Sequence, residues 1–338
     1  MLFVRADGGT EMGLGHLMRS ATLAHEWIAR GGSVTFISAR GSPPGPAASA
    51  GITATWVDAP YPDPRDLRAV SGLVGRHPGS WVVCDGYHFD DAYRKGLRRV
   101  GVRVLAVDDG GQVNLREADG ILNQNLGAQD LGYRSEPLLL LGTRFALLRP
   151  EFRAWHGRRR TVVPRAKQIV VMLGGADHAN HTREILDIVG ALTRDAVAAT
   201  AIIGPSNPHW PALRPNSPLS TVPSVTLLRD PPDLVERMAS ADLAIAAAGT
   251  TTWELCCLGV PTILVVAADN QHIVANALRD EGAALSVGAW NESTAQAIGR
   301  AVTMLIADPE RRASMSQRAS RLVDGWGASR VVDALLST

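Results

Sequence analysis

Short runs of apolar residues alternate with longer amphipathic segments along most of the chain. Residues 2–5 form an apolar run, residues 16–30 carry apolar positions at helical spacing, and residues 33–37 form the next apolar run. A short, continuously apolar run is typical of a strand buried on both faces, and a period of about 3.6 residues is typical of a helix packed against it. The pattern therefore predicts strand, helix, strand units, from which parallel sheets with helices on both faces are built.

The same alternation continues through both halves of the chain and predicts two domains. Between residues 147 and 165 it breaks into Pro, Arg and Trp without a sustained period, which is typical of an interdomain connection. The other expected strands are 53–57, 81–85, 102–107, 120–123, 168–172, 198–203, 224–227, 243–247 and 262–266, and the other expected helices are 64–76, 90–100, 182–192, 232–239 and 327–336. We predict an α/β protein with two Rossmann-like, doubly wound parallel-sheet domains facing across a cleft. They are an amino-terminal domain at 1–150 and a nucleotide-binding domain at 168–325, with a linker at 151–167 and a final segment at 326–338 near the domain junction.

Residues 248–260 carry the most specific chemical signal. Ala248 and Gly249 let the chain turn sharply after a buried strand, and three threonines then open a helix whose first N–H groups have no partner inside it. Such a helix start attracts anions. Glu254 lies one turn into the helix, where its carboxylate can accept hydrogen bonds from both hydroxyls of a ribose whose diphosphate rests on the helix start. This arrangement suits a sugar nucleotide.

The threonines also have a purely structural interpretation, because small polar residues after a strand are ordinary helix N-caps. The context favours a ligand site. Pro261 is expected to close the helix, and the apolar run 262–266 then leads to Asn270 and Gln271. Two strand ends would thus deliver polar groups to one edge of a sheet, where ligands of such folds bind. The expected nucleotide-binding residues are Gly174, Gly175, Gly249, Thr250, Thr251, Thr252, Glu254 and Gln271.

A second glycine-rich turn, at residues 7–19, follows the first strand. Its Gly13-x-Gly15 resembles a dinucleotide fingerprint, but a third correctly spaced glycine is missing and the second strand runs into residues 38–40, Ser-Ala-Arg, without an acidic residue. NAD is therefore not favoured. His16 stands at the helix start directly behind the glycines, where its ring would project into the cleft and the helix dipole would hold it neutral. It is either a general base or a residue that caps or packs beside the turn.

Composition indicates a soluble protein with two cores. The chain has 338 residues, 46% of them hydrophobic, and a formal net charge of +1, which suits two domains of roughly 150 residues each. The basic run at residues 158–160 indicates an exposed linker, so we expect no nucleic-acid partner. The chain starts on a strand, and no stretch approaches the roughly 20 apolar residues of a membrane span. We therefore expect a cytoplasmic location and no membrane partner.

Cysteine and histidine spacing gives no sign of a metal centre. Cys84, Cys256 and Cys257 all fall within apolar elements and are expected to be buried thiols. The nine histidines are scattered, and no Cys/His spacing resembles a zinc site. We predict no bound metal and no cofactor.

Eight short motifs occur in a fixed order along the chain. They are Asp7 with Gly13, Gly15, His16 and Arg19; Asp85, Gly86 and Tyr87 with Asp90; Asp108 with Asp109; Asn123, Gln124 and Asn125; residues 147–152; Gly174, Gly175 and Asp177; residues 249–254; and Asn270 with Gln271. Together they resemble the UDP-2,4-diacetamido-2,4,6-trideoxy-β-L-altropyranose hydrolase family of pseudaminic acid biosynthesis, over nearly the whole chain.

This resemblance implies a fold and a reaction. The family is a relative of the GT-B glycosyltransferases, with the nucleotide held by the second of two Rossmann-like domains, and it hydrolyses its UDP-sugar to UDP and free sugar without a metal. By this resemblance His16 matches the histidine that activates water for inverting attack at the anomeric carbon, and Tyr87 and Asn270 match residues around the sugar and phosphates. The expected catalytic residues are His16, Asp7, Tyr87 and Asn270, and the expected sugar-binding residues are Gly13, Gly15, Arg19, Asp85, Asp109 and Asn125.

The chain also departs from the family pattern near the expected sugar. Gly86 stands where the family commonly has His, Ala176 stands where it has a polar residue, and residues 109–111 are richer in glycine. The prediction thus extends to a UDP-sugar substrate. It leaves open which sugar and which nucleotide base the substrate carries, and whether the protein is a monomer or a homodimer. Two other functions fit the same donor site. One is an inverting GT-B glycosyltransferase in which His16 acts on an acceptor hydroxyl, and the other is a non-catalytic nucleotide-sugar sensor.

Overall fold

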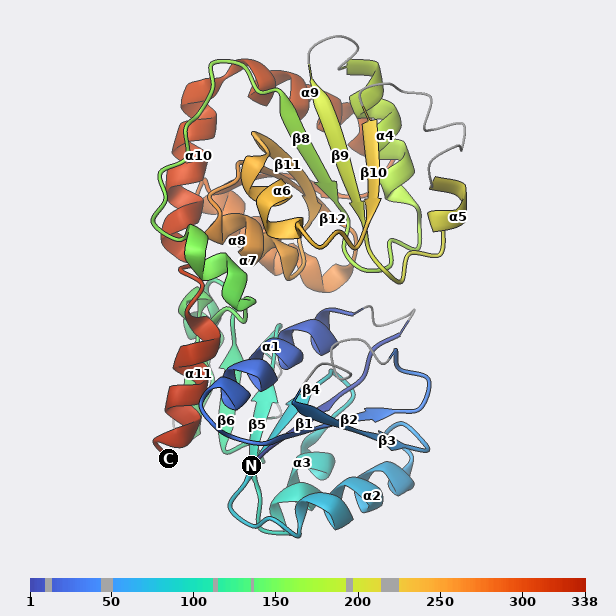
Figure 1. Cartoon of the computed structure of the whole chain (residues 1–338), viewed down its shortest axis with the longest axis vertical. Coiled ribbons are helices and arrows are strands. Elements are labelled where there is room, and N and C mark those ends of the chain that lie inside the picture. The colour runs from blue at the N-terminus through green and yellow to red at the C-terminus, as the bar shows by residue number, and fades with distance from the viewer. Residues whose placement is uncertain (10–13, 44–50, 112–114, 135–136, 193–196, 214–224) are drawn as a thin grey trace. The chain divides into compact units, whose positions relative to one another are not determined.

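The chain folds into two compact units, which are described separately here. The computed structural model describes residues 1–338 except 10–13, 44–50, 112–114, 135–136, 193–196 and 214–224. The first unit comprises Met1–Arg149 with Gly325–Thr338, and the second comprises Pro150–Asp324. Each unit is built on a parallel β-sheet (Figure 1).

The first unit holds a seven-stranded sheet in the order β3-β2-β1-β4-β5-β6-β7. Its strands are β1 Leu2–Ala6, β2 Val34–Ala39, β3 Ile52–Val57, β4 Trp81–Asp85, β5 Arg103–Val107, β6 Gly120–Asn123 and β7 Leu138–Leu141, and its helices are α1 Gly15–Ala29, α2 Pro64–Val74, α3 Asp91–Arg98 and α11 Gly327–Leu336. Alternate residues of β1 enter two different cores, Leu2 and Val4 on the α1 and α11 side and Phe3 on the α2 and α3 side. Burial of both faces explains why the strands are continuously apolar.

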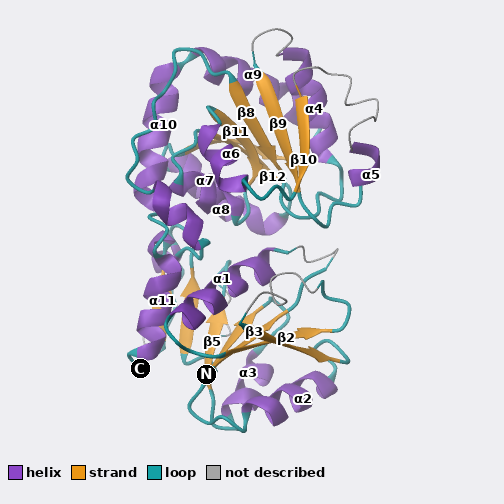
Figure 2. Ribbon diagram, viewed as in Figure 1, coloured by secondary structure: helices purple, strands orange, loops and turns teal. Residues whose placement is uncertain are grey.

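The second unit holds a six-stranded sheet in the order β10-β9-β8-β11-β12-β13. Its strands are β8 Gln168–Met172, β9 Ala198–Ile203, β10 Val225–Arg229, β11 Leu243–Ala247, β12 Thr262–Val266 and β13 Ala284–Ala289, and its helices are α4 His181–Leu192, α5 Trp210–Leu213, α6 Leu234–Ser240, α7 Thr251–Cys257, α8 His272–Asp280, α9 Thr294–Ala307 and α10 Pro309–Leu322. In Figure 2 the strands of each unit form one layer lined by helices.

The strand order of each unit reverses at one point. In the first unit β1 pairs with both β2 and β4, and in the second β8 pairs with both β9 and β11. The loops that leave the carboxyl ends of two such strands diverge to opposite faces of the sheet, which opens a binding place beside them. The end of β1 leads to Asp7 and the end of β4 is Asp85, and the ends of β8 and β11 lead to the glycine turns at 174 and 249.

The predicted architecture is confirmed, with differences at particular elements. Several strands, such as Trp81–Asp85 and Leu243–Ala247, have the predicted bounds. The strands β7 and β13, which lie at sheet edges and are only partly buried, were not predicted. Neither was α10, whose buried positions include Arg312 and Ser316 and so give little hydrophobic period. The helix α7 ends at Cys257 and not before Pro261, because Gly259 adopts a left-handed conformation with φ of 60°.

The predicted linker and the final helix are each part of one of the two units. Residues 151–167, predicted as a linker, lie within the second unit, where Pro150–Trp155 forms a 3-10 helix and the Arg160 guanidinium donates to the carbonyl of Ala239 at 2.6 Å. The predicted helix α11 belongs to the first unit and packs on α1. An ideal Cβ on Gly327 would lie 2.1 Å from the carbonyl oxygen of Ala146, so only glycine allows this approach.

Across the described ranges, no helix is long and apolar enough to cross a membrane. The three cysteines are free and buried, as predicted.

Candidate functional site

The carboxylate of Asp85, at the carboxyl end of β4, is fully buried and has side chains of α1 as its partners. Arg19 donates to it twice, from Nε at 2.8 Å and from a terminal nitrogen at 2.6 Å, and the hydroxyl of Ser20 donates at 2.8 Å. Nδ1 of His16 lies 2.6 Å from its Oδ1. Positions 16, 19 and 20 fall on one face of a helix, so a single turn of α1 surrounds this carboxylate.

This arrangement keeps Asp85 ionised. Burial by itself would raise the pKa of the Asp85 carboxyl, but the charge of Arg19 and the hydrogen bonds from Arg19 and His16 hold that pKa well below its usual range. An ionised carboxylate only accepts hydrogen bonds. A proton on Nδ1 of His16 completes the hydrogen bond to Asp85, while a guanidinium nitrogen of Arg19 also lies 3.0 Å from the same Nδ1. With the proton on Nδ1, the lone pair of a neutral ring is on Nε2, which is the form of histidine that works as a base.

A second carboxylate, Asp109, connects the same arginine to a tyrosine. Arg19 donates to Oδ1 of Asp109 at 2.6 Å, and the hydroxyl of Tyr87 donates to Oδ2 at 2.8 Å. Burial raises the pKa of the Asp109 carboxyl, but Arg19 more than offsets this and the pKa is lowered. The ring of Tyr87 meets the ring of His16 edge to face, with centroids 5.0 Å apart, and Asn125 donates to the Asp109 carbonyl at 2.9 Å.

The structure therefore brings together most of the predicted residues of the first unit. His16, Arg19, Asp85, Tyr87, Asp109 and Asn125 form one connected network, and Gly15 is the first residue of α1 beside them. Gly13 lies outside the described residues. Sequence reasoning missed Ser20, although its spacing of four residues from His16 was a usable signal.

Asp7, predicted to be catalytic, belongs to a different network at the end of the neighbouring strand. Its Oδ1 accepts from Arg5 at 2.5 Å and from the Ala39 N–H at 2.7 Å, and its Oδ2 lies 3.2 Å from Nε2 of His88. Burial opposes ionisation, but His88 and Arg5 hold the pKa of Asp7 below its usual range. Within the described part of the chain, no hydrogen bond joins Asp7 to His16. Sequence reasoning missed His88, which is only one residue past Tyr87.

In the second unit, the turn between β11 and α7 holds the predicted threonines. The N–H groups of Thr252 and Trp253 donate back to the carbonyls of Gly249 and Thr250 at 3.0 and 3.1 Å, and the Thr250 hydroxyl does not cap the helix. The Thr252 hydroxyl is buried and donates to the Ala247 carbonyl at 3.3 Å, so it has a structural partner. The half-buried Glu254 follows one turn later.

Gln271 lies beside this turn. Its Oε1 accepts from the Ala267 N–H at 2.9 Å, and its Nε2 would be 3.8 Å from a Cβ placed on Gly249. An amide donor thus stands next to the start of α7. Asn270 is exposed in the same short 3-10 helix, Asp269–Gln271.

The glycine turn after β8 is built differently. Gly174 has a φ of 81°, and a Cβ on Gly204 would lie 2.4 Å from the carbonyl oxygen of Gly175, so the two turns need glycine to approach each other. The next helix, α4, is capped by its own chain, because the carboxylate of Asp177 accepts from the N–H groups of His181 and Thr182 at 2.9 Å each. At the start of α7, by contrast, the N-cap residue Thr250 makes no side-chain cap hydrogen bond.

Within the described residues, no group of three or more His, Cys, Asp or Glu side chains could hold a metal ion.

Residues 169–327, which make up most of the second unit, match the model of the glycosyltransferase family 28 C-terminal domain. This match covers a little less than half of the chain.

Sequence similarity to related proteins extends over parts of the chain. The chain is 26% identical to the spore coat polysaccharide biosynthesis protein SpsG of Bacillus subtilis over 196 residues. The aligned part covers 57% of this chain and 57% of that protein. It is 38% identical over 109 residues to a UDP-N-acetylglucosamine--N-acetylmuramyl-(pentapeptide) pyrophosphoryl-undecaprenol N-acetylglucosamine transferase of Sorangium cellulosum, which is 31% of this chain and 27% of that protein. The matches thus span little more than half of the first relative's length and about a quarter of the second's.

Similarity to solved structures extends over the whole chain. The crystal structure of MurG from Acinetobacter baumannii superimposes with a TM-score of 0.66 at 17% identity, covering 100% of this chain and 99% of that one. The chain therefore has the two-domain fold of the GT-B glycosyltransferases, as predicted.

We expect replacement of Asp85 by Asn to lower the free energy of unfolding by about 3–5 kcal/mol at neutral pH, because Arg19 loses a buried charged partner. The low pKa of Asp85 stabilises the wild type above the ordinary Asp pKa, about 4, and this contribution is lost as the pH falls further. Urea unfolding at several pH values should show the deficit of the variant shrinking below about pH 4. Asp58→Asn, which breaks an exposed pair with Arg40, should change little. A deficit that does not vary with pH contradicts the assigned ionisation.

Proposed function

We propose that this protein is an inverting glycosyltransferase that takes its sugar from a UDP-sugar and uses His16 as the base. The observation that carries the proposal is the hydrogen bond between Nδ1 of His16 and the ionised Asp85, at 2.6 Å. The match of the second unit to a glycosyltransferase domain and the UDP-N-acetylglucosamine transferase among the relatives support the donor class.

The proposed reaction is a single displacement. Nε2 of His16 takes the proton of an acceptor hydroxyl, the acceptor oxygen forms a bond to the anomeric carbon, and the bond from that carbon to the diphosphate oxygen breaks. UDP leaves as the anion. Attack from the face opposite to UDP inverts the anomeric configuration. Asp85 stabilises the imidazolium that results, as the carboxylate of a catalytic triad does.

The second unit would bind the donor. We place the diphosphate at the turn of Gly249–Thr251, where the N–H groups of Thr250 and Thr251 and the Gln271 amide would donate to it, and we assign the ribose hydroxyls to Glu254. Such fixed dipoles stabilise a leaving diphosphate without a metal ion. Gly174 and Gly175 would approach the nucleotide from the neighbouring strand end. Tyr87, Asp7 and Asn270 are proposed to surround the sugar and its phosphates.

Hydrolysis of the UDP-sugar is the second candidate, with water as the nucleophile in place of the acceptor. His16 is only 8% exposed, and the ring of Tyr87 packs against it. A nucleophile as small as water reaches such a base most easily. The motifs similar to the pseudaminic acid hydrolase family favour the same outcome and name an amino or deoxy sugar as the substrate class.

The two candidates separate in one assay. A panel of UDP-sugars is incubated with the protein in water enriched in heavy oxygen, with and without mixed sugar and lipid-linked acceptors, and UDP release is followed. Release that requires an acceptor supports the transferase, whereas release without one, with the label on the anomeric carbon of the sugar, supports the hydrolase. Label in UDP would mean attack at phosphorus and would refute the role of His16. Tight UDP-sugar binding without turnover would indicate a sensor.

The two units should respond differently to mutation. We expect His16→Ala to lower kcat by about 100-fold or more with little change in UDP affinity, because it removes the base. Glu254→Ala should mainly weaken UDP binding, measured by calorimetry. His77→Ala, an exposed histidine of the first unit, is the matched control and should leave both quantities unchanged. The reverse pattern, with His16→Ala weakening UDP binding and Glu254→Ala lowering only kcat, would exchange the two assignments.

A further inference from the structure

A second histidine of the first unit, His88, takes part in no step of the proposed reaction. It follows Tyr87 directly in the loop after β4, and its side chain is 24% exposed. It is joined to the carboxylate of Asp7, and Arg5 links that carboxylate to Asp66. The side chains of Asp7, Arg5 and Asp66 are at most 3% exposed. Among these four side chains, only His88 reaches the surface.

The contact with Asp7 determines which ring atom of His88 is available to a ligand. Nε2 of His88 lies 3.2 Å from Oδ2 of Asp7. Burial raises the pKa of the Asp7 carboxyl, but the hydrogen bonds from His88 and Arg5 hold it well below its usual range, so the carboxylate is an acceptor. A proton on Nε2 completes this hydrogen bond, and Nδ1 of the neutral ring is then an acceptor too. With the residues that the structure describes, Nδ1 makes no hydrogen bond.

Gly86 leaves space beside this ring edge. An ideal Cβ on Gly86 would lie 2.8 Å from Cε1 and 3.1 Å from Nδ1 of His88. Any larger residue would therefore displace the ring or cover its free nitrogen. The buried ring of Phe89 packs against the imidazole, with centroids 4.0 Å apart, and helps to hold it in place.

Tyr87 connects His88 with the network of His16. Its side chain is 45% exposed, and its ring meets the His16 ring edge to face. The strand β1, which leads to Asp7, pairs with β4, which ends at Asp85. Two histidine–carboxylate pairs thus stand at the ends of two hydrogen-bonded strands, and Tyr87 is next to both.

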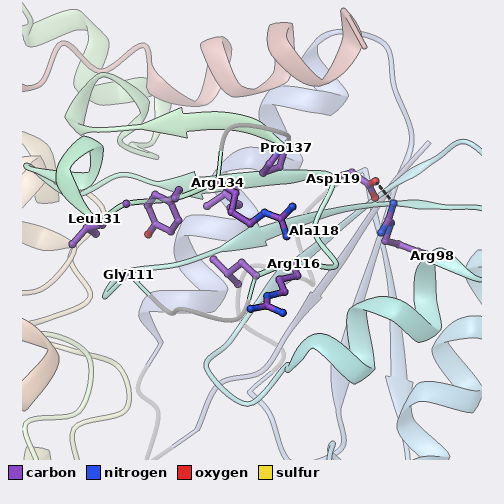
Figure 3. Close-up of a pocket in the computed structure, with 12 residues that line it drawn as sticks. Arg98, Gly111, Arg116, Ala118, Asp119, Leu131, Arg134 and Pro137 are labelled. Atoms are coloured by element: carbon purple, nitrogen blue, oxygen red, sulfur yellow. Dashed lines mark ion pairs between the residues drawn. The ribbon is translucent and has the colours of Figure 1, made fainter.

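The space beside His88 is separate from the enclosed cavity of the first unit. That cavity has a volume of about 300 Å³, and Figure 3 shows Arg98, Ala118 and Leu131 among the residues that line it. None of its described lining residues belongs to the networks of His16 or Asp7. A ligand of His88 therefore binds at the strand ends, where the proposed reaction takes place.

We propose that His88 contacts the sugar that reacts at His16, and that its Nδ1 accepts a hydrogen bond from a hydroxyl or an amide N–H of that sugar. This inference rests on the proposed function, which places the sugar at these strand ends. Asp7 acts on the sugar through His88, as a positioning residue, because its oxygens already accept from Arg5, His88 and the Ala39 N–H. A sugar without a donor at that position would leave Nδ1 unpaired, so His88 selects among UDP-sugars.

Nitrogen-15 NMR of histidine-labelled protein tests the contact without turnover. At about pH 9, where imidazole rings are neutral, His88 should carry its proton on Nε2, the reverse of His16. At least one of UDP-N-acetylglucosamine, UDP-glucose and UDP-galactose should shift Nδ1 of His88, and UDP alone should not. A proton on Nδ1 of the free protein, no shift with any of the three at millimolar concentration, or an equal shift with UDP would overturn the proposal. A shift without turnover of any UDP-sugar would refute the proposed reaction and leave the contact intact.

Two amide variants separate contact with the sugar from support of Asp7, because the amide of Asn takes the place of Nδ1 and that of Gln the place of Nε2. For a UDP-sugar that is turned over, His88→Ala should lower kcat/KM by about tenfold, as for one lost hydrogen bond, with UDP affinity unchanged. His88→Asn should recover most of this loss and His88→Gln should not. Recovery by Gln alone would mean that His88 only supports Asp7. The exposed His77 gives the matched control, since His77→Asn should equal the wild type.

Gly86→Ala tests the space beside the ring. In the wild type its methyl group should displace the imidazole and lower kcat/KM about as much as His88→Ala does. In the His88→Ala background it should have no further effect, because the ring is already absent. An equal loss in both backgrounds would contradict the placement of Nδ1 beside Gly86.

Discussion

The ionised carboxylate of Asp85, buried beneath one turn of α1, is the interaction on which the proposed chemistry depends. An isolated charge at such a depth would be too costly, so the carboxylate requires the guanidinium of Arg19. In the proposed mechanism the same carboxylate accepts the Nδ1 proton of His16 and leaves Nε2 as the basic atom. The arginine therefore makes the ionised carboxylate possible, and in the proposed mechanism the carboxylate would make the histidine a base. Asp109 holds the outer end of Arg19 and ties Tyr87 to the same group.

The parallel sheet explains why these groups meet. Its central strands are buried on both faces, which favours polar side chains at their ends, and β1 and β4 are neighbours although about 75 residues separate them. The chain leaving β1 forms α1, which passes over the end of β4. The second unit repeats the arrangement at β8 and β11, where the turns contain glycine and the N-cap residue of α7, Thr250, makes no side-chain cap hydrogen bond. Each unit thus carries polar groups where its strand order reverses.

The sequence predicts the elements better than it predicts their partners. Apolar runs locate the buried strands, and the glycine turns locate His16 and the start of α7. The pattern gives no sign that Asp85 would lie beneath His16, because that contact depends on which strands become neighbours. Motif similarity placed Asp7 with His16, whereas the fold gives Asp7 its own partners in Arg5 and His88. Helix α10 escapes detection because its buried residues are partly polar, and of the partly buried edge strands β3 and β10 were predicted whereas β7 and β13 were not.

The most direct test of the account is the tautomer of His16, measured by nitrogen-15 NMR of histidine-labelled protein at about pH 9, where imidazole rings are neutral. The account predicts a proton on Nδ1 and a bare Nε2, and loss of this preference in Asp85→Asn. A proton on Nε2 in the wild type would leave no lone pair facing a nucleophile and would contradict the assignment of His16 as the base.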